Sequence, residues 1–524
     1  MPASIKNITQ YIPQSAKVEW HDTTAVFEVA PSDIQKIAND FYHEKHLPLK
    51  MITATDERKE HGCFKIWYVF GVPKENIFLV PFIVLKNTET FPSLATTIHE
   101  AANHERKIQT FFGLTPKGHP DTRPIILHEN WPIDVFPLRK DFDGNPPREA
   151  HGQYNFQKVD GEGIYEIPVG PIHAGIIEPG HFRFSVAGEE IMLLEARLGF
   201  VHKGSEKLFE RLSLTDQVRL SEKISGDSSF SHSLAFCQAV EQLAGIHVSE
   251  HTRFLRVIYA ELERLANHCG DIAFIMLDTG FNFGGSQGTR LREMVMRVNE
   301  RLTGSRFLRG VNGVGGITKD IHATESDGLS RELIVLRKDF SEIIAIAENS
   351  SSLRNRLEDT GILSSDIAKD CGVVGVAGRA IGMVNDARVD YPYAAYTTLH
   401  IGDVATEKKG DAQARFRVRV KEVHASIALI VDALRQLPEE RVTQPVKEVT
   451  LKKNAVAVSI VEGWRGDIVY FVATDAHGAI TRVAPRDPSF LNWSAVGHAG
   501  VGNMVPDFPL INKSFNLSYS GNDL

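Results

Sequence analysis

A long amphipathic segment that begins at Ser249 restricts the fold of this chain more than any other feature. Serine is a preferred N-cap residue, and the apolar side chains after it recur at steps of three and four as far as Leu277. The apolar positions on this face are Leu255, Ile258, Leu262, Leu265, Ala266, Cys269 and Ile272. A helix of this length buries such a face against other long helices, so we expect this stripe to pack rather than to contact a cofactor.

Two further segments carry the same helical spacing and complete an expected bundle. One runs from Leu333 to Ala347 and the other from Val420 to Leu434. Ahead of them, three short segments rich in β-branched and aromatic residues predict a small antiparallel sheet, at 164–169, 182–186 and 190–196. Residues 164–524 therefore predict long helices with a β cap.

The first part of the chain has a different pattern. Residues 64–70 and 77–85 predict paired strands, and a helix is expected from Pro92 to Phe112, ended by Gly113. A polar joint without periodicity, rich in Gly, Pro and Asn, follows and predicts a linker. The expected fold class is α+β, with a small α/β domain at 1–142, the linker at 143–163 and the helical domain at 164–524.

Composition excludes several classes of function. No apolar run reaches the roughly 18 residues that a bilayer-spanning helix needs, and the N-terminus lacks the pattern of a signal peptide. The net charge of -8 argues against a nucleic-acid partner. Cys63, Cys237, Cys269 and Cys371 form no CxxC pair, so we expect buried thiols rather than a zinc or iron–sulfur site. No strand–GxGxxG–helix unit marks a direct NADH site.

Residues 224–233, ISGDSSFSHS, resemble the nickel-binding segment of membrane-bound [NiFe] hydrogenase large subunits, which reads CGICGFAHS. The resemblance places Ser225 and Ser228 where that family has its first two cysteines. Near the C-terminus it places Ser518 and Gly521 where the family's DPCxxC motif has the other two. Nickel and iron in such a site need soft thiolates, so the resemblance implies a chain that does not split hydrogen.

Most of the chain resembles one larger family. Its first part is similar to the C-type (30 kDa) subunit of respiratory complex I. Its second part is similar to the D-type subunit of complex I and to the large subunits of formate-hydrogenlyase-type hydrogenases. The matching segments are 104–113, 118–123, 137–141, 170–173, 178–183, 199–207, 290–293 and 462–467. The chain is identified as a member of this fused C/D-like, group 4 [NiFe]-hydrogenase family (formate hydrogenlyase and hydrogenase-4 type), without the nickel-binding cysteines.

The resemblance also implies catalytic residues. Glu178 lies in a loop of the hydrogenase type, in which the equivalent glutamate relays protons near the metal. His173 is similar to the first histidine of the complex I quinone loop, and Asp278 to the complex I aspartate that pairs with the quinone-site histidine. Phe236 stands where complex I has a tyrosine hydroxyl, and phenylalanine cannot donate that hydrogen bond. We expect Glu178, His173 and Asp278 to converge beside the former nickel position, within hydrogen-bonding or single-water reach.

The former nickel position itself is open to two interpretations. Its expected residues are Ser225, Asp227, Ser228, His232, Phe236, Arg465, Ser518 and Gly521. They either line a wet cavity or form its filled remnant, with the serines bonded to helix carbonyls. Arg465, beside Gly466 and Asp467, could equally make a salt bridge within a hairpin turn.

The resemblance implies a peripheral location on the cytoplasmic face of the inner (plasma) membrane. Electrons would arrive from an iron–sulfur small subunit resembling the B-type subunit of complex I and pass to a quinone or another small acceptor, coupled to ion translocation. A ferredoxin-like subunit and antiporter-like membrane subunits are the other expected partners. We expect no cofactor on this chain itself, iron–sulfur clusters on its partners, and quinone or NAD(H) at the level of the complex. The alternative is a non-catalytic connector between redox and membrane subunits.

Overall fold

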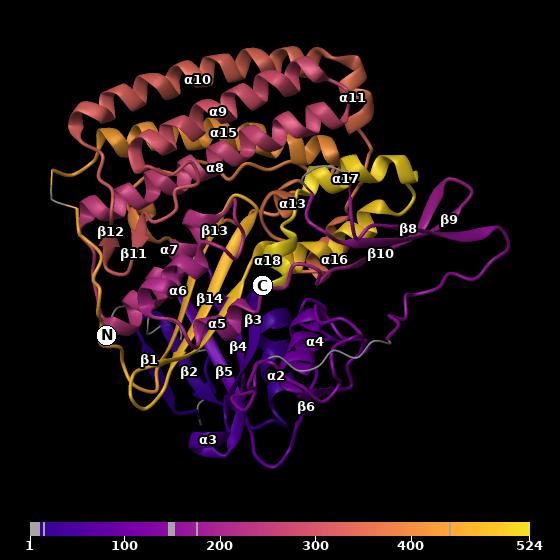
Figure 1. Ribbon diagram of the computed structural model, residues 1–524, viewed down its shortest axis with the longest axis vertical. Helices are drawn as coiled ribbons and strands as arrows, with labels where there is room; N and C mark the ends of the chain where they lie inside the picture. Colours follow the sequence, from indigo (N-terminus) through magenta and orange to yellow (C-terminus); the bar gives the residue numbers. More distant parts are fainter. Residues whose placement is uncertain (1–10, 14–15, 145–151, 174–176, 440–441) are drawn as a thin grey trace.

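The computed structural model describes residues 11–13, 16–144, 152–173, 177–439 and 442–524. Part of the predicted linker, residues 145–151, lies outside the described residues. The fold is α+β, as expected, with a β-rich N-terminal region followed by long helices and further sheets (Figure 1).

The N-terminal region is built on a five-stranded sheet in the order β1-β2-β5-β4-β3. Its strands are β1 (Val18–His21), β2 (Thr24–Glu28), β3 (Leu49–Glu57), β4 (Cys63–Val72) and β5 (Ile77–Leu85). Both predicted strands are confirmed within β4 and β5. Smaller elements complete the region: α2 (Ile34–Asn39), η1 (Asp40–Glu44), α3 (Arg58–His61), β6 (Thr90–Pro92), α4 (Ala101–Phe112) and β7 (Thr115–Lys117).

The helix predicted from Pro92 begins only at Ala101, although it ends at Gly113 as expected. Pro92 lies in β6 instead, paired with β7. The carboxylate of Glu105 accepts hydrogen bonds from the Ser93 hydroxyl and the Leu94 amide, at 2.5 and 2.6 Å. These side-chain bonds fix Ser93 and Leu94 beside α4 in a non-helical conformation, so the helix begins only at Ala101.

The second region opens with the three-stranded sheet β10-β9-β8, as predicted. Its strands are β8 (Ile164–Val169), β9 (His181–Ala187) and β10 (Glu190–Arg197). The turn between β9 and β10 contains Gly188, whose φ of 63° lies in the left-handed region that glycine adopts at no steric cost. In Figure 1 this sheet extends away from the helices toward one end of the molecule.

The three predicted helices are confirmed within α8 (Glu250–Asp278), α10 (Ala323–Asn349) and α15 (Ala412–Arg435), and α9 (Asn282–Thr303), which was not predicted, packs with them as a bundle. Ser249 caps α8 as expected, since its hydroxyl accepts from the Thr252 amide. Helix α8 packs against both α9 and α15, α10 packs against the same two helices, and α8 lies on the side of the bundle that faces the sheets (Figure 1). None of the described helices has the length and apolar composition that crossing a bilayer requires.

The shorter elements of this region connect the bundle to the sheets. They are α5 (Ser205–Phe209), α6 (Leu214–Ser221), α7 (Ser229–Ala244), β11 (Asn312–Gly313), β12 (Gly316–Ile317), α11 (Ser351–Leu357), α12 (Ser365–Asp370), α13 (Gly375–Arg379), α14 (Ala387–Asp390), η2 (Ala394–Thr397), α16 (Pro488–Gly500), η3 (Val505–Asp507), α17 (Phe508–Phe515) and α18 (Tyr519–Asp523).

A third sheet, which the sequence patterns did not single out, joins the two regions. It consists of β13 (Val456–Gly463), β14 (Gly466–Thr474) and β15 (Ile480–Arg486). Every residue of β14 is buried. Apolar side chains of this sheet share one core cluster with side chains of the N-terminal sheet, such as Trp67 and Val80. The two regions therefore pack as one body around β13–β15.

Candidate functional site

Segments far apart in the sequence meet between α7 and α18. Ser225, just before α7, donates a hydrogen bond to Ser518, the N-cap residue of α18, with 2.9 Å between the hydroxyl oxygens. Both serines are buried, at 1% and 5% exposure. The structure thus brings together two of the positions where the hydrogenase resemblance places cysteines.

Arg465 reaches the same place from the tip of the β13–β14 hairpin. Its guanidinium holds both carboxylate oxygens of Asp227 at 2.7 Å, and its Nε donates to the carbonyl of Asn516 at 2.5 Å. The expected alternative, a salt bridge within the hairpin turn, is wrong, because Asp467 bonds Lys50 and Arg486 instead. Burial alone would raise the pKa of Asp227, but the charge and hydrogen bonds of Arg465 hold it below its usual value.

The loop before β9 brings Glu178 to this cluster. Its carboxylate accepts a hydrogen bond of 3.1 Å from the backbone amide of Ser520, and the hydroxyls of Ser520 and Ser518 lie 3.3 Å apart. We call Glu178, Ser225, Asp227, Arg465, Ser518 and Ser520 the serine cluster. The side chain of Asp227 keeps 36% of its exposure, so the cluster is reached from solvent on that side.

His232 lies one helical turn into α7, with no exposed surface. Its Nε2 is 3.0 Å from a carboxylate oxygen of Asp487, and its Nδ1 is 3.1 Å from the hydroxyl of Tyr470. Burial would raise the pKa of Asp487, but the hydrogen bond from His232 and the charges of His232 and Arg465 keep it lowered. Asp487 and Tyr470 were not predicted from the sequence; they lie on or directly after the unpredicted third sheet.

The former nickel position does not fit nickel in its present chemistry. Of its expected ligand positions, Ser225, Ser228 and Ser518 offer hydroxyls, and Gly521 offers no side chain. A Cβ on Gly521 would lie 2.5 Å from the carboxyl carbon of Asp487, so protein atoms fill the space that a fourth ligand would need. Within the described residues there is also no group of three His, Cys, Asp or Glu side chains placed to hold a metal ion.

Asp278, His173 and Phe236, which were predicted at this site, have their contacts elsewhere. Asp278 is exposed at the C-terminal end of α8, where Lys513 is the charge that acts on it. The Nε2 of His173 bonds the carbonyl of Gly180, 2.7 Å away, within its own loop. Phe236 is fully buried in the apolar core against Phe209. Within the described residues, Glu178 is the one of the three that bonds a member of the serine cluster, at the Ser520 amide, so the predicted convergence of Glu178, His173 and Asp278 is not observed.

Another acid beside the cluster was missed. Glu263, on α8, accepts from the Phe230 and Ser231 amides at 2.6 and 3.1 Å, at the start of α7. Burial raises its pKa to about 7, and the nearby charge of Asp227 acts in the same direction. The sequence signal that could have revealed Glu263 is an acidic residue among the apolar positions of the helix predicted after Ser249.

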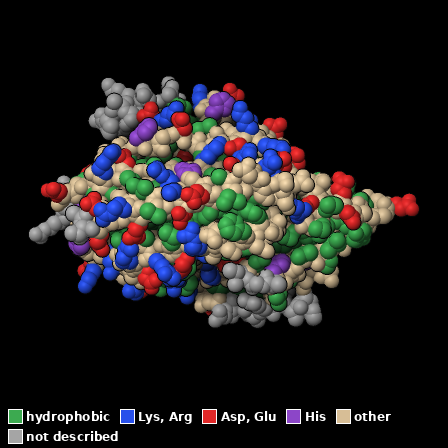
Figure 2. Space-filling view, turned by 90° about the horizontal axis from the view of Figure 1, so that it is seen from above, with side chains coloured by type: hydrophobic (Ala, Val, Ile, Leu, Met, Phe, Trp, Pro, Cys, Tyr) green, Lys and Arg blue, Asp and Glu red, His purple; other side chains and the backbone are tan. Residues whose placement is uncertain are grey.

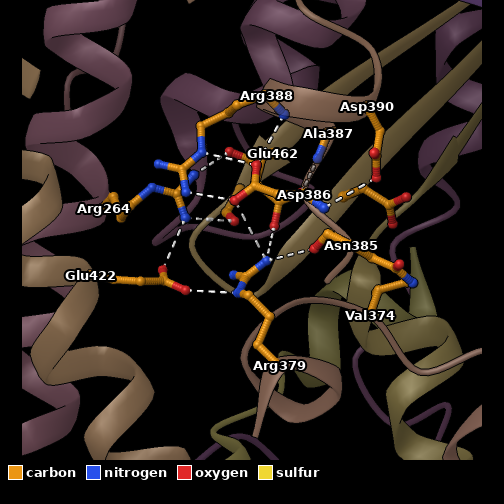
Figure 3. A network of polar contacts seen from close by, with 12 residues as sticks. Arg264, Val374, Arg379, Asn385, Asp386, Ala387, Arg388, Asp390, Glu422 and Glu462 are labelled. Atoms are coloured by element: carbon orange, nitrogen blue, oxygen red, sulfur yellow. Dashed lines mark hydrogen bonds and ion pairs between the residues drawn. The ribbon is translucent and has the colours of Figure 1, made fainter. Parts of the chain in front are cut away.

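A second buried polar assembly, the arginine network, is drawn in Figure 3. It joins α8, α13–α15 and β13 and consists of Arg264, Arg379 and Arg388 with Glu261, Asp386, Glu422 and Glu462. Arg379 lies at its centre, with Nε 2.8 Å from Glu422 and Nη1 2.8 Å from Glu462. No side chain in the network is more than 6% exposed.

Comparison with known proteins agrees with this architecture. The family model described as respiratory-chain NADH dehydrogenase, 30 Kd subunit, matches residues 27–148. The one described as respiratory-chain NADH dehydrogenase, 49 Kd subunit, matches residues 278–459. Together the matches define a component of a complex-I-related oxidoreductase complex.

Several characterised proteins are similar over most of their length. Formate hydrogenlyase subunit 5 of Escherichia coli is 31% identical over 498 residues, which cover 94% of this chain and 87% of that protein. Hydrogenase-4 component G of Escherichia coli is 32% identical over 490 residues, covering 92% and 84%. The fused C/D subunit of NADH-quinone oxidoreductase from Phocaeicola vulgatus is 28% identical over 444 residues, covering 81% and 85%. The chain belongs to the family of fused complex I 30 kDa/49 kDa (C/D) subunits, related to the large subunits of hydrogenase-4 and formate hydrogenlyase.

Proposed function

We propose that this chain provides the acceptor site of a membrane-associated, complex-I-like redox complex. Electrons from an iron–sulfur partner pass to a quinone or another small acceptor, and the transfer is coupled to ion translocation. The observation that carries the proposal is the serine cluster: hydroxyl donors and an arginine–carboxylate pair gather at one buried place that opens to solvent at Asp227. Donors of this kind bind a carbonyl oxygen and stabilise charge that develops on it.

The same donor set argues against nickel chemistry in this chain. Hydroxyl groups with their ordinary high pKa do not replace thiolates as ligands of nickel, and Gly521 contributes no donor. Metal analysis of the purified complex should therefore find far less than one nickel ion per chain. A value close to one would restore the hydrogenase assignment.

The surface of the second region supports a role in a larger assembly. Hydrophobic side chains gather on the face shown in Figure 2, toward the end where β8–β10 lie. Exposed apolar residues on or next to this sheet include Tyr165, Met192 and Met504, at 52%, 44% and 45% exposure. We propose partners of the complex I type: an iron–sulfur small subunit, a ferredoxin-like subunit and antiporter-like membrane subunits, with this chain peripheral on the cytoplasmic face.

A connector without chemistry of its own is the second candidate. The direct hydrogen bond between Ser225 and Ser518, and the contact of Gly521 with Asp487, favour it, because they fill the former metal position with protein. A connector needs the subunit interfaces but no acceptor site. The two candidates therefore differ in what a change inside the serine cluster does to electron transfer.

Arg465→Lys in the intact complex separates them. Lysine keeps the positive charge but loses the fork that binds Asp227 through two hydrogen bonds, so an acceptor site should lose at least about tenfold in turnover. Arg301→Lys, whose side chain is 51% exposed, is the matched control and should have no effect. Normal quinone reduction by a fully assembled Arg465→Lys complex would leave only the connector.

A further inference from the structure

Three cavities are linked by the side chains that they share, and the last of them adjoins the serine cluster. The first and largest of the three is a hollow of about 400 Å³ between α4, β10 and α16, with Glu100 in its wall. Glu100 also lines the second cavity, of about 130 Å³, together with Lys50, Asp467 and Arg486. Arg486 in turn lines the third, of about 20 Å³, whose wall includes Asp487. Consecutive cavities therefore share a polar side chain.

Glu100 stands between the first two cavities. It is the N-cap residue of α4, but its side chain makes no capping bond and turns toward the second region instead. A Cβ on Gly372 would clash with its Oε2, so this glycine makes room for the carboxylate. The other carboxylate oxygen, Oε1, is buried and has no hydrogen-bond partner among the described residues. A buried carboxylate oxygen next to a cavity is a position that ordered water satisfies.

Arg486 stands between the second and third cavities and is 2% exposed. Its Nη2 donates to Asp467 at 2.7 Å, and Asp467 also accepts from Lys50 at 2.7 Å. The Nε and Nη1 of Arg486 are buried without a partner in the described part of the chain. The second cavity has room for several waters and the third for roughly one, each with polar partners in its wall.

The third cavity ends at the site already described. Asp487 directly follows Arg486 in the chain and holds His232 at 3.0 Å. Gly521, which also lines this cavity, presents no side chain between it and Asp487. The amide of Gly521 donates to the hydroxyl of Ser518 at 2.9 Å, so the cavity adjoins the serine cluster.

We infer that these cavities form a water-filled proton route in which Glu100 takes up protons from bulk water and passes them to Asp487 and His232 beside the serine cluster. This route rests on the proposed function, because it would carry protons to the acceptor site. If the acceptor is a quinone, two electrons come from the iron–sulfur partner and two protons travel this route, which together yield the quinol. Each proton binds and leaves Glu100 once per transfer, so the carboxyl is restored.

The charges around Glu100 suit a group that exchanges protons. Burial raises its pKa to about 8, although Lys50, Arg486 and the Leu49 amide favour the ionised form. Its carboxyl is therefore mostly protonated at neutral pH and loses its proton as the pH rises through about 8. The other titratable groups in the walls of the second cavity or next to Glu100 are Tyr42, Lys369, Cys371 and Asp467.

The test uses the intact complex with Glu100→Gln, which keeps the shape of the side chain but cannot exchange a proton. Wild-type quinone reduction should fall as the pH rises through about 8, because Glu100 is then ionised. The variant should turn over at least about tenfold more slowly at neutral pH and should lose that alkaline limb. Glu100→Asp, which retains an exchangeable proton, should restore part of the rate. Asp370→Asn, an exposed acid near the same cavity, is the matched control and should behave as wild type.

An infrared measurement separates a failure of the route from a failure of the proposed function. The difference spectrum between wild type and Glu100→Gln should contain a protonated carboxyl band that titrates near pH 8 and shifts promptly in D₂O. A wild-type rate and pH profile in Glu100→Gln would overturn the route, and so would a carboxyl band that does not exchange in D₂O. A complex that shows the exchanging band but reduces no acceptor would sink only the proposed function.

Discussion

The serine cluster and the arginine network are both buried and polar, yet they are built in opposite ways. The arginine network sets three arginines against four carboxylates in a sealed interior, where no member is more than 6% exposed. The serine cluster has one arginine, neutral hydroxyls and an aspartate side chain that keeps 36% of its exposure. The first arrangement fixes helices to a sheet, whereas the second leaves the Asp227 side chain partly open to solvent.

Charge balance explains how the network tolerates its burial. Burial and the nearby charge of Asp386 raise the pKa of Glu462, whereas the pKa values of Glu261, Asp386 and Glu422 are lowered, so Glu462 is the carboxyl of the network that gives up its negative charge most readily. The remaining carboxylates then match the arginines more closely. Replacing one member leaves its partners buried without compensation, which is the costly change in such assemblies. The comparison teaches that a sealed network of paired charges holds helices to a sheet, whereas the serine cluster carries less charge and is less sealed.

The largest effect should come from Arg379→Leu in the network. This change leaves Glu422 and Glu462 without the guanidinium that each contacts at 2.8 Å. The free energy of unfolding should fall by about 3–5 kcal/mol, measured by denaturant titration of the purified complex. Arg290→Leu, at a pair with Asp339 whose arginine is 46% exposed, should cost less than about 1 kcal/mol. Equal losses in the two variants would remove the distinction between scaffold and surface pairs.

A smaller effect is expected from Glu263, the acid beside the serine cluster. Its pKa in the folded state is raised from 4.5 to about 7, so the folded state binds more protons than the unfolded state between these values. Stability contributed by this group is therefore present at low pH and is lost as the pH rises toward about 7, by up to about 3 kcal/mol. Glu263→Gln should flatten the pH dependence of unfolding over this window relative to wild type. Glu332→Gln, at an exposed pair with Arg301, should leave the wild-type slope, and a slope that Glu263→Gln does not change would contradict the assignment.

The smallest effect should come from Gly521→Ala, which tests how tightly the former metal position is filled. The added methyl group would lie 2.5 Å from the carboxyl carbon of Asp487, which His232 and the Ser489 amide hold in place. We expect a loss of about 1–3 kcal/mol in the free energy of unfolding, as for overpacking elsewhere. Gly328→Ala, in α10 with open space around its Cβ position, should be neutral or slightly stabilising. If Gly521→Ala leaves the free energy of unfolding unchanged, the protein atoms around Gly521 are packed less tightly than the connector candidate requires.

Local patterns predicted the elements of this fold well. The periodicity after Ser249 predicted α8 nearly to its ends, and the β-branched segments predicted β8–β10. The predicted start of α4 was wrong because the side chain of Glu105, within α4, holds Ser93 and Leu94 in a loop. Such a bond depends on tertiary placement, which spacing along the chain does not report.

The candidate site was predicted only where a motif carried it. Ser225 and Ser518 meet, and Glu178 reaches Ser520, but the expected approach of Asp278 failed because α8 ends at the surface. The partners of His232 beside the cluster are Tyr470, in β14, and Asp487, directly after β15. The alternation that marks a half-exposed strand is absent where a strand is buried on both faces, as β14 is.

The same sheet has a consequence for how such a protein can be encoded. Lys50 of β3 bonds Asp467 of β14, Arg482 of β15 bonds the hydroxyl of Thr53, and a shared apolar cluster lies around them. The halves on either side of the joint at 143–163 are thus held by surfaces that form whether or not the peptide between them is continuous. Two separate genes would yield the same particle, provided that their products were made in equal amounts. Fusion into one reading frame fixes that ratio at one to one.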